Sequence, residues 1–263
     1  MDLQQELVQA LEAIQLASAK VLQIYQQADI RTTYKKEDCS PLTEADLASD
    51  QIIVNYLTKQ FSYPILSEER AENHERFLSS RVWVLDPLDG TKEFLAKKAE
   101  FTINLALLEN NQPVLGLVSC PVQRRIYYAV AEEGAYLVDN QKKQRIRVGN
   151  RRQLSNLKIT VSRSHFDESL NSVLQQIPEH SLHSLGSALK YCAIAEGSMD
   201  LTLRKTPLHE WDIAASDCII REAGGQITNW LGERLTYNRP HTLFDEGIIA
   251  SNGFLNQLIT SLP

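Results

Sequence analysis

The chain has 263 residues, a net charge of −6 at neutral pH, 43% hydrophobic residues and 23% charged residues. These values are typical of a globular protein with a sizeable core, and the length favours two lobes over one small domain. The acidic balance and the lack of a basic stripe argue against binding to a nucleic-acid polymer.

The N-terminus carries acids where a secretory signal needs bases, and no apolar run approaches the roughly 18 residues of a membrane span. The cysteines Cys39, Cys120, Cys192 and Cys218 are widely spaced, which argues against a zinc site and fits a reducing compartment. The sequence therefore predicts a cytoplasmic protein without a transmembrane segment. Peripheral association with the inner face of the membrane, and the choice between monomer and homodimer, stay open.

The first half of the chain is expected to combine helices with a meander of strands. Apolar residues at helical spacing predict a long amphipathic helix over 2–27, and a second helix follows at about 43–60 after a polar loop. Strands are then predicted near 63–66, 82–85, 101–108, 114–119, 126–130, 135–138 and 144–148.

From about residue 150, strands and helices alternate. Strands are expected at 157–162, 199–203, 226–228 and 248–251, and helices at 168–176, 187–195, 211–223 and 254–262. Alternation of this kind is typical of an α/β lobe. The sequence therefore predicts an α/β protein with an α+β lobe over 1–150, an α/β lobe over 151–263 and a cleft between them.

Residues 86–94 read Asp-Pro-Leu-Asp-Gly-Thr-Lys-Glu-Phe, directly after the apolar run 82–85. A strand that ends in two aspartates, closed by Pro and Gly, brings two carboxylates into one tight turn. Such like charges are costly unless a cation lies between them, and carboxylate and carbonyl oxygens suit magnesium. Thr91 is then placed to orient a water on the metal. On its own, however, the motif is better explained by an ordinary turn with solvated aspartates.

Three other segments place acids at the ends of predicted elements. Residues 65–69 run from an apolar pair into Ser-Glu-Glu, residues 43–46 open the second helix, and Asp212 lies in the first turn of a later helix. Taken alone, these are a surface acid pair, helix N-capping and an acid favoured by the helix dipole. Their combination with the 86–94 motif is the specific signal.

This combination resembles the magnesium-dependent, lithium-sensitive phosphatase superfamily of inositol monophosphatase and fructose-1,6-bisphosphatase. Within it, the chain is most similar to bacterial 3'(2'),5'-bisphosphate nucleotidases of the CysQ type. The motif at 86–94 matches that group residue for residue, and the similarity runs over essentially the whole chain. Further matching segments are 40–46, 66–69, 100–104, 162–165, 186–190 and 211–215. Inositol monophosphatases usually carry Thr-Asn in place of Lys92-Glu93, which favours the nucleotidase group.

The resemblance implies a layered αβαβα sandwich and a site for two or three magnesium ions. Asp86 is expected to bridge two ions, and Thr91 and Asp46 are the implied catalytic pair, a proton relay that activates the attacking water. The implied metal ligands are the Leu88 carbonyl and four carboxylates, those of Glu68, Asp86, Asp89 and Asp212.

Substrate contacts follow partly from chemistry and partly from the resemblance. Gly90 and Thr91 offer backbone N–H groups at a turn, an arrangement that binds phosphate. Ser187 and Lys190 resemble the sugar-phosphate contact of the nucleotidases, although a helix N-cap with a surface lysine is an equal alternative. His165 is expected to contact adenosine or phosphate, with a plain loop residue as its alternative. The expected substrate-binding set is Glu68, Leu88, Asp89, Gly90, Thr91, His165, Ser187, Lys190 and Asp212.

Two further groups of residues have expected roles, one of cations and one of aromatic side chains. Lys190, Arg204 and Lys205 are candidates for the positive field that an anionic substrate needs. His209 is expected to line the cleft, because magnesium disfavours imidazole, and Trp211 is expected to pack rather than to stack on a base.

The implied activity is a magnesium-dependent hydrolysis of the 3'-phosphate of adenosine 3',5'-bisphosphate, which yields AMP and phosphate. The partner is then a small anionic nucleotide, with the 3'-phosphorylated sulfate donor as a second candidate, and the role lies in sulfur assimilation and nucleotide recycling. One alternative is an inositol monophosphatase or a broad sugar-phosphatase. Another is a non-catalytic metal- or nucleotide-binding regulator, against which the intact set of acids and Thr91 argues.

Overall fold

The computed structural model describes residues 3–34, 41–163 and 167–262. Its largest element is a seven-stranded sheet in which the strands follow chain order. These strands are β3 (Ile65–Ser67), β4 (Arg81–Asp89), β5 (Thr102–Glu109), β6 (Gln112–Cys120), β7 (Arg125–Val130), β8 (Gly134–Asp139) and β9 (Lys142–Ile146). Only β3 and β4 run parallel, and the other pairs are antiparallel.

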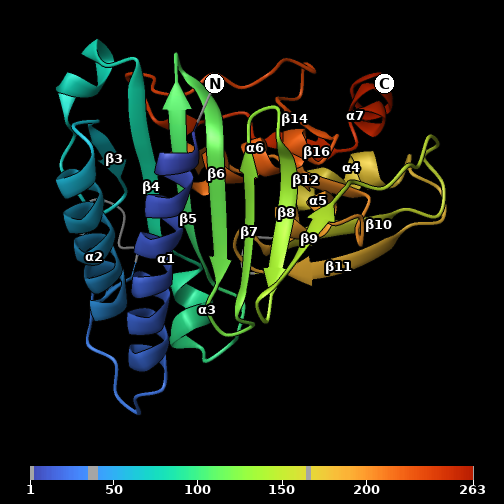
Figure 1. Cartoon of the computed structure of the whole chain (residues 1–263). Coiled ribbons are helices and arrows are strands. Elements are labelled where there is room, and N and C mark those ends of the chain that lie inside the picture. The colour runs from blue at the N-terminus through green and yellow to red at the C-terminus, as the bar shows by residue number, and fades with distance from the viewer. Residues whose placement is uncertain (1–2, 35–40, 164–166, 263) are drawn as a thin grey trace.

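Two long helices, α1 (Gln4–Tyr25) and α2 (Glu44–Gln60), lie side by side against one face of this sheet (Figure 1). The buried side of α1 recurs every three or four residues at Leu7, Ala10, Ile14, Ala17 and Val21, as the amphipathic pattern predicted. Between the helices, β1 (Thr32–Tyr34) pairs with β2 (Pro41–Thr43), where the sequence indicated only a loop.

A second sheet of five strands has the order β11-β10-β12-β16-β14 and lies to the right in Figure 1. Its members are β11 (Ser181–Leu185), β10 (Lys158–Ser162), β12 (Leu201–Arg204), β16 (Ile248–Ser251) and β14 (Gln226–Thr228). The first three are parallel, and β16 runs antiparallel to both of its neighbours.

Helices fill the space between the two sheets and cover the outer face of the second. The helices α5 (Leu189–Ala195) and α6 (Glu210–Glu222) share one apolar core with both sheets. On the outer face, α4 (Asn171–Leu174), η2 (Glu168–Leu170) and α7 (Phe254–Thr260) pack onto β10 and β12. The layers therefore follow the order αβαβα, which confirms the predicted α/β sandwich.

Helix α6 approaches the first sheet very closely. A Cβ atom at Gly116 on β6 would overlap the carbonyl oxygen of Ala215, so glycine is required where this helix crosses the strand. The position of α6 relative to the sheet is therefore tightly fixed, and with it the position of Asp212 in the first turn of the helix.

Short elements complete the described chain: η1 (His74–Leu78), α3 (Thr91–Leu95), β13 (Leu208–His209) and β15 (Leu243–Phe244). The first sheet ends at Ile146 and the second begins at Lys158 in β10, so we propose that the boundary between the lobes 1–150 and 151–263 falls in this connection. No helix in the described ranges is both long and apolar enough to span a membrane.

Candidate active site

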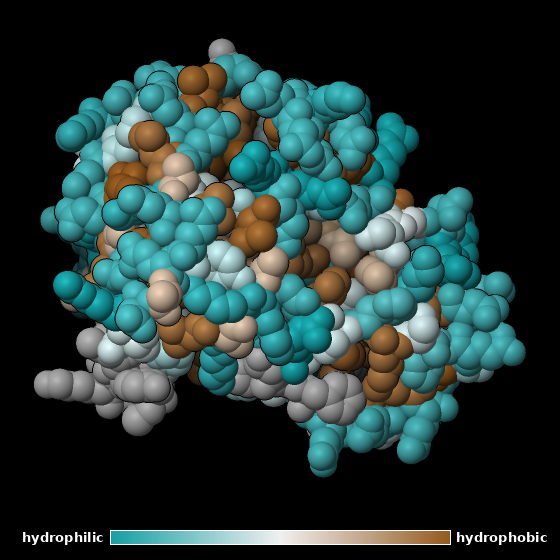
Figure 2. Space-filling view, turned by 90° about the horizontal axis from the view of Figure 1, so that it is seen from below, coloured by the Kyte–Doolittle hydropathy of each residue, from teal (hydrophilic) through white to brown (hydrophobic). Residues whose placement is uncertain are grey.

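Strands β3 and β4 bring two acids to the same edge of the first sheet. Ser67 pairs with Leu85, and the backbone N–H of Glu68 donates to the Leu85 carbonyl at 3.2 Å, so Glu68 and Asp86 follow at adjacent positions. Figure 2 views the molecule from the end at which β4 finishes and α3 lies. Hydrophilic residues dominate this face, and apolar residues appear as separate patches, which suits a charged ligand.

The turn after β4 and the start of α6 form a cluster of three carboxylates. One oxygen each from Asp86, Asp89 and Asp212 lies within 4.8 Å of the others. Burial raises the pKa of all three groups, to about 6 for Asp89 and for Asp212, and mutual repulsion adds to this effect. Glu68 lies outside this tight group, but its charge raises the pKa of both Asp86 and Asp212.

The donor set of this cluster fits a magnesium ion. All of its donors are hard carboxylate oxygens, and Asp86 is buried with only 1% of its surface exposed. The alternative of solvated aspartates in an ordinary turn is therefore wrong for Asp86. Because three acids gather where each ionised group disfavours the next, a divalent cation is the simplest way to balance the charge.

The backbone of the turn is held by its own side chains. The N–H of Leu88 donates to Asp86 Oδ1 at 3.1 Å, and the Leu88 carbonyl accepts the Thr91 hydroxyl at 3.2 Å. Gly90 has a φ of 91°, a left-handed conformation that other residues rarely adopt. Asp86 and Gly90 are thus required by the turn itself.

Asp46 reaches this turn from the start of α2. Its Oδ2 accepts the backbone N–H of Thr43 at 2.9 Å and the Thr43 hydroxyl at 2.5 Å, and its Oδ1 lies 3.3 Å from the Thr91 hydroxyl. Burial raises the pKa of Asp46 to about 6; the hydrogen bonds from Thr43 oppose this, and the Glu68 charge adds to it. One oxygen of Asp46 therefore caps its helix while the other faces Thr91.

Asp212 caps the start of its own helix, α6, in the same way. It is the third residue of its helix, and its Oδ2 accepts the backbone N–H of His209 at 2.7 Å. Arg204 lies close enough to oppose the raised pKa of both Asp212 and Asp89. Arg204 was noted in the sequence only as one of several cations, and its proximity to the cluster comes from the fold.

Lys190 is a buried cation beside the cluster, with 4% of its surface exposed, so the alternative of a surface lysine is wrong. Burial lowers the pKa of Lys190 to about 8, and the Asp89 carboxylate opposes this shift. The ammonium donates to the Ser187 carbonyl at 2.6 Å. The Ser187 hydroxyl is buried and has no hydrogen-bond partner among the described residues, so it does not cap α5.

His165 lies outside the described residues, so its expected contact with the substrate stays a prediction. His209 stacks on Trp211 with 4.4 Å between ring centroids, and its Nδ1 lies 3.0 Å from the Thr242 hydroxyl. His209 is not among the residues of the carboxylate cluster, and its place in the wall of the cleft stays a prediction.

Two supporting residues on β5 were missed in the sequence. The Asn104 amide donates to Asp89 Oδ2 at 3.3 Å, and the Thr102 hydroxyl lies 3.5 Å from the same oxygen. A signal was present, because Thr102 and Asn104 are two apart, and so point to one face, in a strand that is apolar from Leu105 to Leu108.

Comparison with known proteins agrees with this geometry. The family model described as the inositol monophosphatase family matches residues 2–262. The chain belongs to the inositol monophosphatase family. It is 38% identical to the 3'(2'),5'-bisphosphate nucleotidase CysQ of Salmonella typhimurium over 243 residues, which cover 92% of this chain and 97% of that protein.

Solved structures of family members are similar as well. CysQ from Bacteroides thetaiotaomicron superposes with a TM-score of 0.81 at 32% identity, over 93% of this chain and 96% of that one. A staphylococcal family member, SaIMPase-II with 2'-AMP bound, gives a TM-score of 0.78 at 25% identity, over 96% of this chain and 90% of that one.

Proposed function

We propose that this chain is a magnesium-dependent 3'(2'),5'-bisphosphate nucleotidase that hydrolyses the 3'-phosphate of adenosine 3',5'-bisphosphate to AMP and phosphate. The observation that carries the proposal is the cluster of Asp86, Asp89 and Asp212 beside the Thr91–Asp46 contact. The identity to CysQ over nearly the full length of that protein supports the choice of a nucleotide.

In this proposal the metal ligands are Glu68, Asp86, Asp89 and Asp212 together with the Leu88 carbonyl. Magnesium bound there would neutralise phosphate charge, lower the pKa of a water and stabilise the leaving oxygen. The turn fixes Asp86, and the Asn104 amide on β5 holds Asp89. The end of β3 presents Glu68, and the capping contact on α6 fixes Asp212. How many ions bind is a matter for measurement, with two or three expected.

Thr91 and Asp46 are the proposed proton relay. The Thr91 hydroxyl orients the attacking water and donates toward Asp46 Oδ1, which leaves the hydroxyl oxygen able to accept from the water. Asp46 is suited to this role because its raised pKa makes its carboxylate a better proton acceptor than an exposed aspartate.

Binding of the anionic substrate falls to cations and backbone donors around the cluster. Lys190 and Arg204 supply positive charge within reach of Asp89 and Asp212. Gly90 and Thr91 offer backbone N–H groups to the phosphate, and the Ser187 hydroxyl, buried without a described partner, is available to the sugar or its phosphate.

A phosphate-release panel tests the proposal. Purified protein with magnesium is given adenosine 3',5'-bisphosphate, the 3'-phosphorylated sulfate donor, inositol 1-phosphate and 2'-AMP. We expect the highest kcat/KM for adenosine 3',5'-bisphosphate. A preference for inositol 1-phosphate would support an inositol monophosphatase instead, and no release from any substrate would support a non-catalytic regulator.

The proposed biological role is removal of this bisphosphate as a by-product of sulfate activation, with recycling of its nucleotide. We place the protein in the cytoplasm on this basis, with peripheral association with the inner membrane open to fractionation. The oligomeric state is open to sedimentation.

A further inference from the structure

Glu100 lies between two glycine turns of the candidate active site. A Cβ atom at Gly90 would lie 3.0 Å from the Glu100 carbonyl oxygen, and one at Gly186 would lie 2.7 Å from the same oxygen. A Cβ atom at Gly90 would also lie 3.3 Å from the Cβ of Ser187. The turn after β4 and the turn before α5 therefore touch each other and share one backbone contact.

The side chain of Glu100 holds the turn before α5 by hydrogen bonds. Its Oε2 accepts the backbone N–H of Gly186 at 2.9 Å and Arg163 Nε at 2.6 Å, and its Oε1 accepts Arg163 Nη2 at 2.8 Å. Arg163 also donates to the Ser184 carbonyl at 2.6 Å. Burial acts to raise the pKa of Glu100, yet the pKa is lowered because the bonds from Arg163 and Gly186 favour the carboxylate.

The turn held in this way carries two polar groups of the candidate site. Ser187 is left-handed with a φ of 46°, and its buried hydroxyl has no partner among the described residues. Its carbonyl accepts the buried ammonium of Lys190, whose charge acts on Asp89. A left-handed serine costs backbone energy, so the surrounding contacts must hold it in place.

We propose that Glu100 is a positioning residue for substrate binding. Its carboxylate holds the Gly186–Ser187 turn against the Asp89–Gly90 turn, and Arg163 fixes the carboxylate. The ligand class is a phosphate ester of a sugar or nucleoside, one polar group of which becomes the partner of the Ser187 hydroxyl. This inference rests on the proposed phosphatase function and gives a role to Glu100, which the sequence analysis named only as part of the matching segment 100–104.

A purely structural ion pair is the competing explanation. Half-exposed pairs contribute roughly 0–1 kcal/mol to stability, so such a role predicts a small change in Tm and no change in KM. The chain offers a matched control in Arg125–Asp139, which has 2.8 Å between Arg125 Nη2 and Asp139 Oδ2. Its side chains are 41% and 28% exposed, against 33% and 23% for Arg163 and Glu100.

The test compares Glu100→Ala, Glu100→Gln and Arg163→Gln with the control Asp139→Ala. We expect Glu100→Ala to raise KM about tenfold or more, because a charge-assisted bond to the turn is lost, with a much smaller change in kcat. Glu100→Gln should lie between Glu100→Ala and wild type, because its amide oxygen still accepts the Gly186 N–H. Asp139→Ala should keep the wild-type KM, while its Tm should fall by a small amount similar to the fall in Glu100→Ala.

An unchanged KM in Glu100→Ala overturns the proposal, and so does an equal rise in KM in Asp139→Ala. If Glu100→Ala does not fold, the KM values of Glu100→Gln and Arg163→Gln are compared with that of Asp139→Ala instead. An unchanged KM in both variants then overturns the proposal. The dissociation constant of AMP, measured by calorimetry, gives a readout independent of turnover and should follow KM. If wild type hydrolyses inositol 1-phosphate and not the bisphosphate, the proposed function fails and the KM comparison is made with inositol 1-phosphate.

Discussion

The hydroxyl of Thr91 lies 3.3 Å from Oδ1 of Asp46, although 45 residues separate them in the chain. Packing of α2 against the end of β4 creates this contact. The hydroxyl also lies 3.2 Å from the Leu88 carbonyl, so its single proton has two acceptors within the same turn. The relay can therefore be tested apart from the carboxylate cluster.

Removing either half of the relay should slow turnover without weakening binding. We expect Thr91→Ala and Asp46→Asn each to lower kcat by about 10²–10⁴-fold, because the lost proton transfer occurs in the transition state. KM and the magnesium dependence should change far less. Steady-state kinetics at several magnesium concentrations measures all three quantities.

Thr91→Ser is the control, since it keeps the hydroxyl and should retain most of the activity. The double variant should be little worse than either single one, because both residues serve one step. Multiplicative losses in the double variant, or a collapse of magnesium dependence in Asp46→Asn, would contradict the assigned roles.

Magnesium should stabilise the protein and be required for activity. A ligand that binds only the folded state adds about 2.7 kcal/mol at one hundred times its Kd. Asp86→Asn should lose turnover and most of this gain. Without metal, however, it should melt higher than wild type near neutral pH, because it removes a buried charge repelled by Glu68, Asp89 and Asp212.

Differential scanning fluorimetry with chelator and with magnesium measures both effects. The substitution Asp139→Asn, at a half-buried aspartate outside the cluster, serves as the comparison and should respond to magnesium as wild type does. Full activity in excess chelator, or an undiminished magnesium gain in Asp86→Asn, would count against the metal site.

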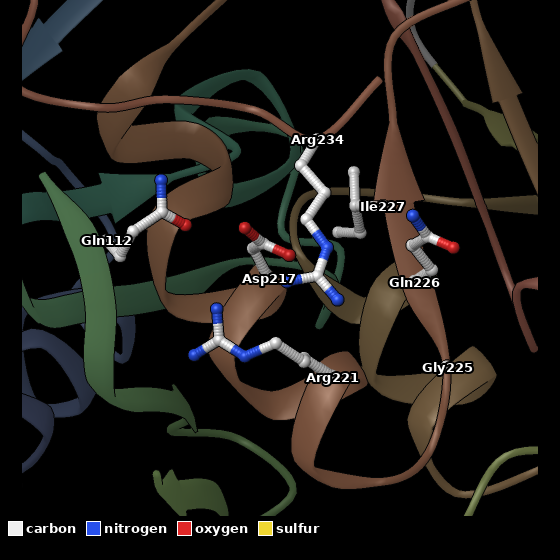
Figure 3. A pocket seen from close by; sticks show the side chains of 7 residues that line it. All are labelled: Gln112, Asp217, Arg221, Gly225, Gln226, Ile227 and Arg234. Carbon is white, nitrogen blue, oxygen red and sulfur yellow. The ribbon is translucent and has the colours of Figure 1, made fainter. Parts of the chain in front are cut away.

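At the far end of α6 from Asp212, a small cavity of about 60 Å³ is lined by Asp217, Arg221 and Arg234 among others (Figure 3). Burial raises the pKa of Asp217 above its usual 3.8, although Arg221, the Tyr237 hydroxyl and Arg234 oppose the shift. A raised pKa in the folded state means that the stability contributed by the protonated acid is present below pH 3.8 and is lost as pH rises through the folded pKa.

Asp217→Asn mimics the neutral acid and can still accept the Tyr237 hydroxyl, which lies 2.9 Å from Asp217 Oδ2. Its advantage over wild type in the free energy of unfolding should therefore grow as pH rises from acidic to neutral. Urea unfolding near pH 3.8 and at about pH 8 checks the sign. A constant difference between the two pH values would show that Asp217 does not titrate in this way.

Arg76 is fully buried and joins the segment before β4 to the loop after β14. Its guanidinium donates to Asn238 Oδ1 at 2.7 Å and to the Arg239 carbonyl at 2.8 Å. Arg76→Ala should cost about 1–3 kcal/mol for each buried acceptor left without a donor. Chemical denaturation measures this loss. Arg125→Ala, at an arginine whose side chain is 41% exposed and whose partner Asp139 is 28% exposed, is the comparison expected to cost less.

The sequence predicted elements well where a local pattern determined them. The helical spacing of α1 and the apolar run of β4 each depend on neighbours in the chain, and both were found. Strand β11 was missed because Ser181–Leu185 is short, polar and mostly exposed, and its pairing with β10 comes from a partner distant in sequence. Such an edge strand leaves little periodic signal.

The candidate active site likewise has features that local sequence predicts and features that depend on the fold. The turn at Asp86–Gly90 can be predicted locally, because the left-handed backbone needs Gly90 and Asp86 accepts the Leu88 N–H. Burial of Lys190 and the approach of Arg204 to Asp212 depend on how α5 and β12 pack. Local sequence patterns do not predict this packing. Family resemblance supplied Lys190 and marked the segment 100–104, and the fold showed which contacts Glu100, Thr102 and Asn104 make there.

Asp46 and Asp212 each use one carboxylate oxygen to cap the first turn of their own helix. Asp46 accepts the backbone N–H of Thr43, and Asp212 accepts that of His209. Thr91 caps no helix, since α3 begins from the conformation of Gly90, and its hydroxyl has one backbone contact, at 3.2 Å from the Leu88 carbonyl. A descendant of this chain released from selection for catalysis would therefore drift unevenly. Thr91, with a single contact to its turn, would change earlier than the two aspartates, which would persist as helix caps. Retention of the aspartates in a relative is therefore weaker evidence of activity than retention of the threonine.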